Sequence, residues 1–236
     1  MWFKILLNQI LAPEKAYNDL DQEYGKNEFY AYPWIFVLLV YSAIMIPASL
    51  SMTPKMKQFI PAFVEKMAEK NGFNEAMTAR VMTSMEKSIS FQSYFIPVNL
   101  ILIILLVSLL TWIYLYLFYY NLSFGKIYTV MMLSYAPAII GSLVSIAYHH
   151  ATGFKGIAGF GDFQNMTLGV HLFIKGLNPV LKNFLSFVNI FSLWSLFVTI
   201  TGISVLSKKP FARTAFILFI PYLILNAGLA FLRGNV

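Results

Sequence analysis

The chain has 236 residues, of which 58% are hydrophobic and 11% are charged, and its formal net charge is +7 at pH 7. This composition is typical of a multi-pass membrane protein and excludes an ordinary soluble domain. The basic residues are scattered through loops and juxtamembrane positions, which suits anionic lipid headgroups and argues against nucleic-acid binding. Because the chain has no cysteine, disulfides, thiolate metal ligands and cysteine nucleophiles are excluded as well.

Residues 1–32 are predicted to form an N-terminal interfacial, amphipathic segment. The first eleven residues place their large apolar side chains mostly on one side of a helix that is too short to cross a bilayer. No cleavage site of a signal peptide follows. After Pro13 the chain is polar and acidic, and Asp19, Asp21 and Glu23 lack the glycine turn and distal glutamate of an EF-hand loop. A solvated helical face is therefore expected there.

The rest of the chain, residues 33–236, is predicted to be one membrane domain. Five apolar runs have about the 20 residues that a helix needs to cross a hydrocarbon core of about 30 Å. The expected spans are residues 33–52, 94–120, 127–148, 187–207 and 212–232. The predicted fold class is an all-α integral membrane protein with five transmembrane helices, an N-terminal interfacial helix and an amphipathic helical hairpin between spans 1 and 2.

That hairpin corresponds to residues 54–93, where charged residues alternate with apolar residues at helical spacing. The Asn71-Gly72 pair predicts the turn between two amphipathic helices. Two interpretations stay open. The apolar faces can pack on this protein's own surface, or their methionines can form an adaptable groove for a partner helix.

Residues 149–185 are expected to form an interfacial loop with a short in-plane helix that begins at Asn178-Pro179, because asparagine is a good N-cap and proline suits the first helical position. His149, His150 and His171 are the weak candidates for metal ligands. Adjacent histidines on a helix point about 100° apart and cannot easily share one ion. No metal site and no cofactor are expected.

Two stripes of small and polar residues mark the helix faces that are expected to pack closely. Pro137, Gly141 and Ser145 recur every four residues in the third span. The fourth span carries Asn189, Ser192, Ser195, Thr199 and Gly202. The alternative is that these two spans line a path for a neutral or lipid-like solute.

Other classes of function find less support. Coupled pumps usually place an ionisable residue inside a span, and none of the five spans has one at mid-membrane. No set of nucleophile, base and orienting residue can be named at a useful depth, so catalysis is not expected.

Three stretches resemble the Yip1 domain family: Ile10–Tyr17, Ser134–Gly141 and Phe191–Lys209. The resemblance covers nearly the whole chain and implies a five-helix bundle with a cytosolic N-terminus. It also implies a non-enzymatic role in membrane organisation or trafficking. The expected partners are membrane lipids and other membrane proteins or further copies of the chain. The Asp-Leu-x-Gly-Pro motif of members linked to Rab GTPases is missing, so Rab binding is not carried over.

The short N-terminal segment resembles the bacterial branch, which implies the bacterial inner membrane. The raw distribution of lysine and arginine leans against a cytosolic N-terminus, with seven on the N-terminal side and ten on the other. Short connections are the stronger evidence, and Lys126 with the Lys208, Lys209 and Arg213 group favours a cytosolic N-terminus.

Overall fold

The computed structural model describes residues 7–8, 10–24, 31–154, 169, 171, 174 and 176–234. Within these ranges every regular element is a helix, which confirms the predicted all-α class. The helices are α2 (Pro13–Tyr24), α3 (Ala31–Asn71), α4 (Glu75–Leu117), α5 (Phe124–Ser134), α6 (Ala136–Ala151), α8 (Pro179–Phe187), α9 (Ile190–Ser207) and α10 (Phe211–Gly234). The first six residues of the predicted interfacial helix lie outside the described residues.

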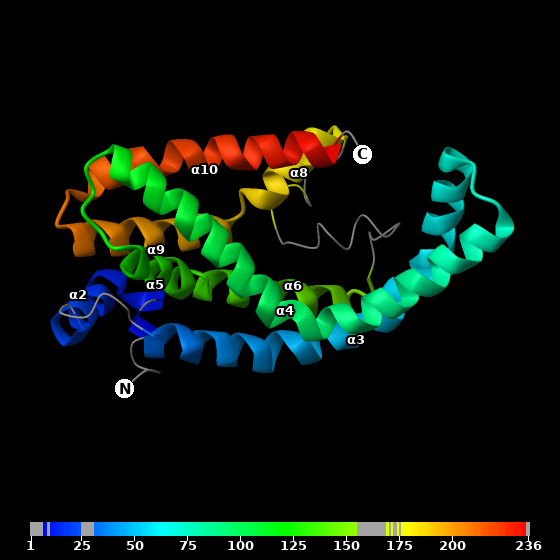
Figure 1. Ribbon diagram of the computed structural model, residues 1–236, viewed down its shortest axis with the longest axis horizontal. Coiled ribbons are helices and arrows are strands. Elements are labelled where there is room, and N and C mark those ends of the chain that lie inside the picture. The colour runs from blue at the N-terminus through cyan, green and yellow to red at the C-terminus, as the bar shows by residue number, and fades with distance from the viewer. Residues whose placement is uncertain are drawn as a thin grey trace.

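Five helical segments are long and apolar enough to cross a membrane, as predicted. They are Ile35–Asn71, Glu75–Leu117, Phe124–Ala151, Ile190–Ser207 and Phe211–Leu232. The third segment combines α5 and α6, and half of its most apolar window is buried, the largest share among the five. Figure 1 accordingly shows α5 and α6 between α3 and α9.

The first two spans are parts of much longer helices. α3 has 41 residues and α4 has 43. Each is about 60 Å long, twice the thickness of a hydrocarbon core. The predicted hairpin is therefore the continuation of these two helices beyond the bundle, as Figure 1 shows, and not a separate pair of helices.

The turn of the hairpin lies where the Asn71-Gly72 pair predicts it. Gly72 has φ +68°, the left-handed conformation that glycine adopts readily. Asn74 caps α4 by accepting the Met77 N–H at 2.9 Å. Ile60 and Val64 of α3 pack with Ile89 of α4 in a small apolar cluster. The two helices thus have a hydrophobic contact of their own beyond the bundle.

The third span is interrupted at Tyr135. Pro137 has no N–H to donate to the carbonyl of Leu133, which removes one backbone hydrogen bond of a continuous helix at this position. α5 ends at Ser134 and α6 begins at Ala136. The ring of Tyr41 from α3 lies edge-to-face against Tyr135 with centroids 5.7 Å apart.

The fourth and fifth spans form a hairpin of α9 and α10. α9 begins at Ile190, three residues after the predicted start of the span, because the side chain of Asn189 caps the helix. α8 is the short helix expected at Asn178-Pro179, and Asn178 accepts the Leu181 N–H at 2.7 Å. α8 packs against α10.

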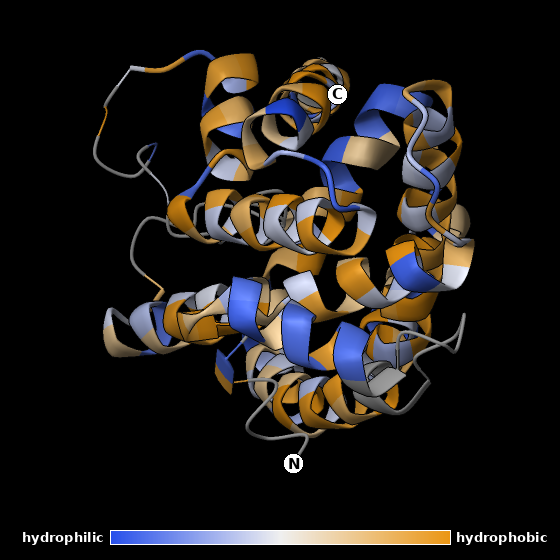
Figure 2. Cartoon of the chain, turned by 90° about the vertical axis from the view of Figure 1, so that its left-hand side faces the viewer, coloured by the Kyte–Doolittle hydropathy of each residue, from blue (hydrophilic) through white to orange (hydrophobic). Residues whose placement is uncertain are grey.

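The turn between α9 and α10 lies beside α2 at one end of the bundle, and the C-terminus lies at the other end (Figure 1). Figure 2 views the first of these ends and shows hydrophilic residues there among largely hydrophobic helices. This arrangement is that of a bundle with an odd number of crossings.

Candidate functional site

The polar residues at the start of α9 are used in capping and in helix contacts. The side chain of Asn189 accepts the N–H groups of Phe191 and Ser192, both at 3.0 Å. The Asn189 N–H donates in return to the Ser192 hydroxyl at 2.9 Å, which completes a capping box. Tyr222 of α10 donates to the same hydroxyl at 3.0 Å. Asn189 and Ser192 therefore fix the start of α9 against α10.

Gly141 of α6 is a point of close approach between the third and fourth spans. A Cβ atom at Gly141 would lie 2.6 Å from Cγ of Phe191, so the phenyl ring fills the space that a side chain would need. Ser145, one turn further along α6, is also buried. Pro137 lies in the first turn of α6. The structure thus brings the third-span stripe against the beginning of α9.

Further along α9 the stripe stays within the protein. The Thr199 hydroxyl donates to the Ser195 carbonyl at 2.9 Å, and Thr199 is buried. The buried Ser195 hydroxyl has no hydrogen-bond partner among the described residues. Neither of the two cavities described below is lined by any predicted stripe residue. The solute path along these residues stays a prediction.

The side chain of Tyr17 from α2 packs on Gly202, the last residue of the α9 stripe. A Cβ atom at Gly202 would lie 2.4 Å from Cζ of Tyr17. Tyr17 is fully buried, and its hydroxyl donates to the Val130 carbonyl of α5 at 3.4 Å. Burial raises the pKa of the Tyr17 phenol above its usual range, so the group is neutral. One aromatic ring therefore joins α2, α5 and α9.

α2 is thus more than the solvated helix expected from its acidic residues. Ala16 and Leu20 are fully buried on the same face as Tyr17. Asp21, on the flank of that face, forms an ion pair with Lys126 at 3.4 Å. The spacing of these residues is that of one helix face. The acidic residues around them lower the mean hydropathy of this twelve-residue helix, so the apolar face was not predicted.

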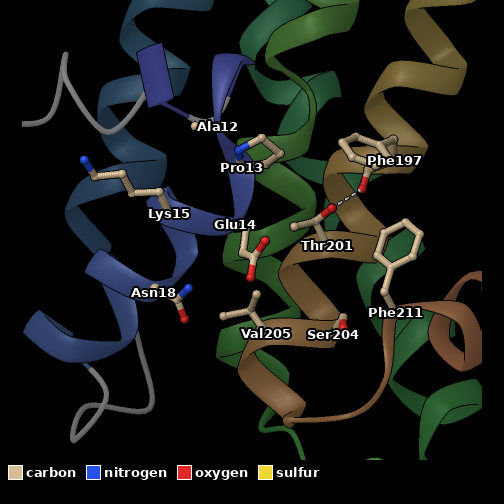
Figure 3. Close-up of a pocket in the computed structure, with 10 residues that line it drawn as sticks. All are labelled: Ala12, Pro13, Glu14, Lys15, Asn18, Phe197, Thr201, Ser204, Val205 and Phe211. Carbon is tan, nitrogen blue, oxygen red and sulfur yellow. Dashed lines mark hydrogen bonds between the residues drawn. The ribbon is translucent and has the colours of Figure 1, made fainter.

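A cavity of about 880 Å³ lies next to this contact, between α2 and the last turns of α9 (Figure 3). Its lining consists of Ala12, Pro13, Glu14, Lys15, Asn18, Phe197, Thr201, Ser204, Val205 and Phe211. Figure 3 shows the Glu14 carboxylate between the two helices and the Lys15 amine pointing away from α9. No sequence motif predicts this cavity, because its two sides are about 190 residues apart in the chain.

A second, smaller cavity of about 550 Å³ lies along the start of α4 in the projecting hairpin. Its lining includes Met77, Arg80 and Val81. Met77 and Arg80 are exposed. This part of the hairpin offers both an apolar and a cationic contact to the surroundings.

The three candidate metal ligands do not form a recognisable centre in the described residues. His150 is hydrogen-bonded through Nε2 to the Ser51 hydroxyl at 3.0 Å. The ring of His149 stacks on Phe154 with centroids 6.4 Å apart, and His171 is buried. No group of three or more histidine, cysteine, aspartate or glutamate residues that could hold an ion occurs in the described part of the chain.

Comparison with protein-family models matches residues 8–232 to the Yip1 domain. No curated protein and no solved structure matches the chain. The matched region includes the three stretches on which the resemblance was based. In the structure the first stretch meets the third where Tyr17 packs on Gly202, and the second meets the third where Phe191 packs on Gly141.

Proposed function

The chain belongs to the Yip1 domain family, and from this premise we propose that it is a non-enzymatic multi-pass membrane protein with a membrane-organising role. It acts through contacts with lipids and with other membrane proteins. Its place is the bacterial inner membrane, with the N-terminus in the cytosol. Family membership and the five apolar helices support the membrane setting.

The observation that carries this proposal is the close packing of the two spans that would have to open for conduction. Phe191 occupies the space beside Gly141. The polar groups at the start of α9 form hydrogen bonds within the helix cap or with Tyr222 of α10. Such packing of small residues holds membrane helices together without a hydrophobic driving force between them. It favours a stable bundle that presents its outer faces to other molecules.

Those outer faces are large and apolar. Leu106 of α4 is 57% exposed and Phe216 of α10 is 70% exposed, so both helices offer lipid-facing surfaces. The hairpin of α3 and α4 adds a second kind of surface beyond the bundle, where Arg80 lines the cavity at Met77. We assign lipid contact to the first surface and contact with membrane-protein partners to the second.

The test uses purified protein in phospholipid vesicles. We expect the flux of neutral solutes and of a fluorescent phospholipid to equal that of empty vesicles. We also expect the purified protein to retain phospholipid in native mass spectrometry. Flux above the empty-vesicle rate, or turnover of a defined substrate, would refute the proposal.

The second candidate is a facilitator of a neutral or lipid-like solute that uses the third and fourth spans. The break at Tyr135 favours it, because interrupted helices at membrane depth occur where backbone groups are buried in protein or line a cavity. The same flux assay decides between the two. A facilitator would give flux that falls when Gly141→Leu further blocks the contact with Phe191.

A further inference from the structure

One face of α9 changes from apolar to polar along its length. Ile190, Leu193 and Phe197 are exposed by 71%, 40% and 48%. Thr201 and Ser204 continue the same three- and four-residue steps, so all five side chains share one side of the helix. The apolar part of this face begins at the first residue of α9, and the hydroxyl part lines the cavity beside α2.

The hydroxyl part lies within about 10 Å of the end of α9 that carries Lys208. Thr201 is seven residues before Lys208, which ends α9 in a left-handed conformation. Seven residues of helix span about 10 Å. Lys208 and Arg213 are exposed at this end of the bundle, where cationic side chains meet the polar surface of a membrane.

The cavity combines a carboxylate with aromatic rings. Glu14 is exposed and forms no ion pair with another described residue. Figure 3 shows its carboxylate pointing from α2 toward the last turns of α9. The rings of Phe197 and Phe211 line another wall, with centroids 5.7 Å apart. A carboxylate next to aromatic faces is a favourable setting for an ammonium group.

Three cationic residues are part of the cavity lining or close to it in the chain. Lys15 is part of its lining, and Lys208 and Arg213 flank the residues Val205 and Phe211 in the chain. A phosphate held near these cations would leave an attached ammonium free to approach Glu14. A headgroup with phosphate alone would have no partner for the carboxylate and would be repelled by it.

We propose that this cavity binds the headgroup of a phospholipid that carries an ammonium group. Glu14 contacts the ammonium, and the exposed face formed by Ile190, Leu193 and Phe197 lies along an acyl chain. The volume of about 880 Å³ lies in the usual range of small-molecule sites. This inference rests on the proposed function and names the lipid class for its lipid contacts.

The experiment measures lipid binding to the detergent-purified full chain by native mass spectrometry. The probes are phosphatidylethanolamine, phosphatidylcholine and phosphatidylglycerol with identical acyl chains. Glu14→Gln removes the carboxylate and keeps the size of the side chain. Glu69→Gln is the matched control, because Glu69 is an exposed carboxylate on the projecting hairpin.

We expect the wild-type chain to bind at least one ammonium-bearing lipid more tightly than phosphatidylglycerol. Glu14→Gln should raise the dissociation constant of that lipid about fivefold. This is the upper end of the effect expected from loss of one solvent-accessible ion pair. The same substitution should leave phosphatidylglycerol binding unchanged or stronger, and Glu69→Gln should change neither. A stronger effect for phosphatidylethanolamine than for phosphatidylcholine would support direct hydrogen bonding to a primary ammonium.

Equal binding of all three lipids by the wild-type chain would overturn the inference. Equal effects of Glu14→Gln and Glu69→Gln would also overturn it, because they would show a response to net charge alone. Neither result affects the proposed function, whose test is vesicle flux together with retention of any phospholipid. Thermal melting of both variants checks that the fold is intact.

Discussion

Replacement of Gly202 by alanine should loosen α2 from α9. The added Cβ would lie 2.4 Å, 2.6 Å and 2.8 Å from Cζ, Cε2 and Cε1 of Tyr17. Carbon atoms in contact lie about 3.5 Å apart, so the ring has to move by about 1 Å. Tyr17 is fully buried between α2, α5 and α9, so we expect the movement to displace α2 as a whole.

Such overpacking costs about 1–3 kcal/mol, which multiplies the population with α2 detached by roughly 5 to 150. The chain has no cysteine, so a single cysteine reports this opening directly. Ala16→Cys places a thiol on the buried face of α2. Its rate of labelling by a maleimide should rise by the same factor when Gly202→Ala is added, because only the open state exposes it.

Two controls make the prediction specific. Gly228→Ala also adds a methyl group to a helical glycine, but no atom lies within 4 Å of that position, so the labelling rate should not change. In a Tyr17→Ala background the added methyl has space, and Gly202→Ala should then change the rate less than about twofold. An unchanged rate in Gly202→Ala, or an equal increase in both backgrounds, would show that the ring and the glycine are not coupled.

Gly141→Ala should destabilise the bundle by about 1–3 kcal/mol, since its Cβ would lie 2.6 Å from Cγ of Phe191, and Phe191→Ala in the same chain should remove most of the additional loss in a thermal melt. Asn189→Ala removes the side chain that accepts two backbone N–H groups at the start of α9, and should lower the unfolding free energy by about 0.5–2 kcal/mol in a denaturant titration; a stability equal to the wild type would show that water replaces the cap. Single cysteines at Asn18 in α2 and at Met77 in the hairpin should be labelled by an impermeant maleimide from opposite sides of the membrane, and labelling from one side would contradict the arrangement of the five spans.

Much of the fold was predictable because bilayer thickness constrains sequence directly. Apolar runs of sufficient length predicted the five spans, and the Asn71-Gly72 pair predicted the turn of the hairpin. The lengths of α3 and α4 were not predicted, because the hydrophobic pattern changes at the membrane surface while the backbone helix continues. The amphipathic part was therefore assigned to separate helices.

The contacts between distant segments were harder to predict. The spacing of Gly141 and Gly202 indicates that another group approaches closely, but it does not identify that group. Phe191 and Tyr17 occupy these positions, and one of them comes from a helix whose acidic residues suggested exposure. The cavity at Glu14 depends on the same contact, so single-sequence reasoning could not find it.

The packing of Tyr17 on Gly202 also sets the order in which the protein can be completed during synthesis. The two residues are 185 positions apart in the chain, and α2 leaves the ribosome long before α9 exists. At 5–20 residues per second this interval lasts roughly 10 to 40 s. Throughout it, the apolar side of α2 lacks its contact with Gly202, and only its contact with Val130 of α5 can form earlier. The contact of α2 with α9 is thus completed only after the fourth span has been made.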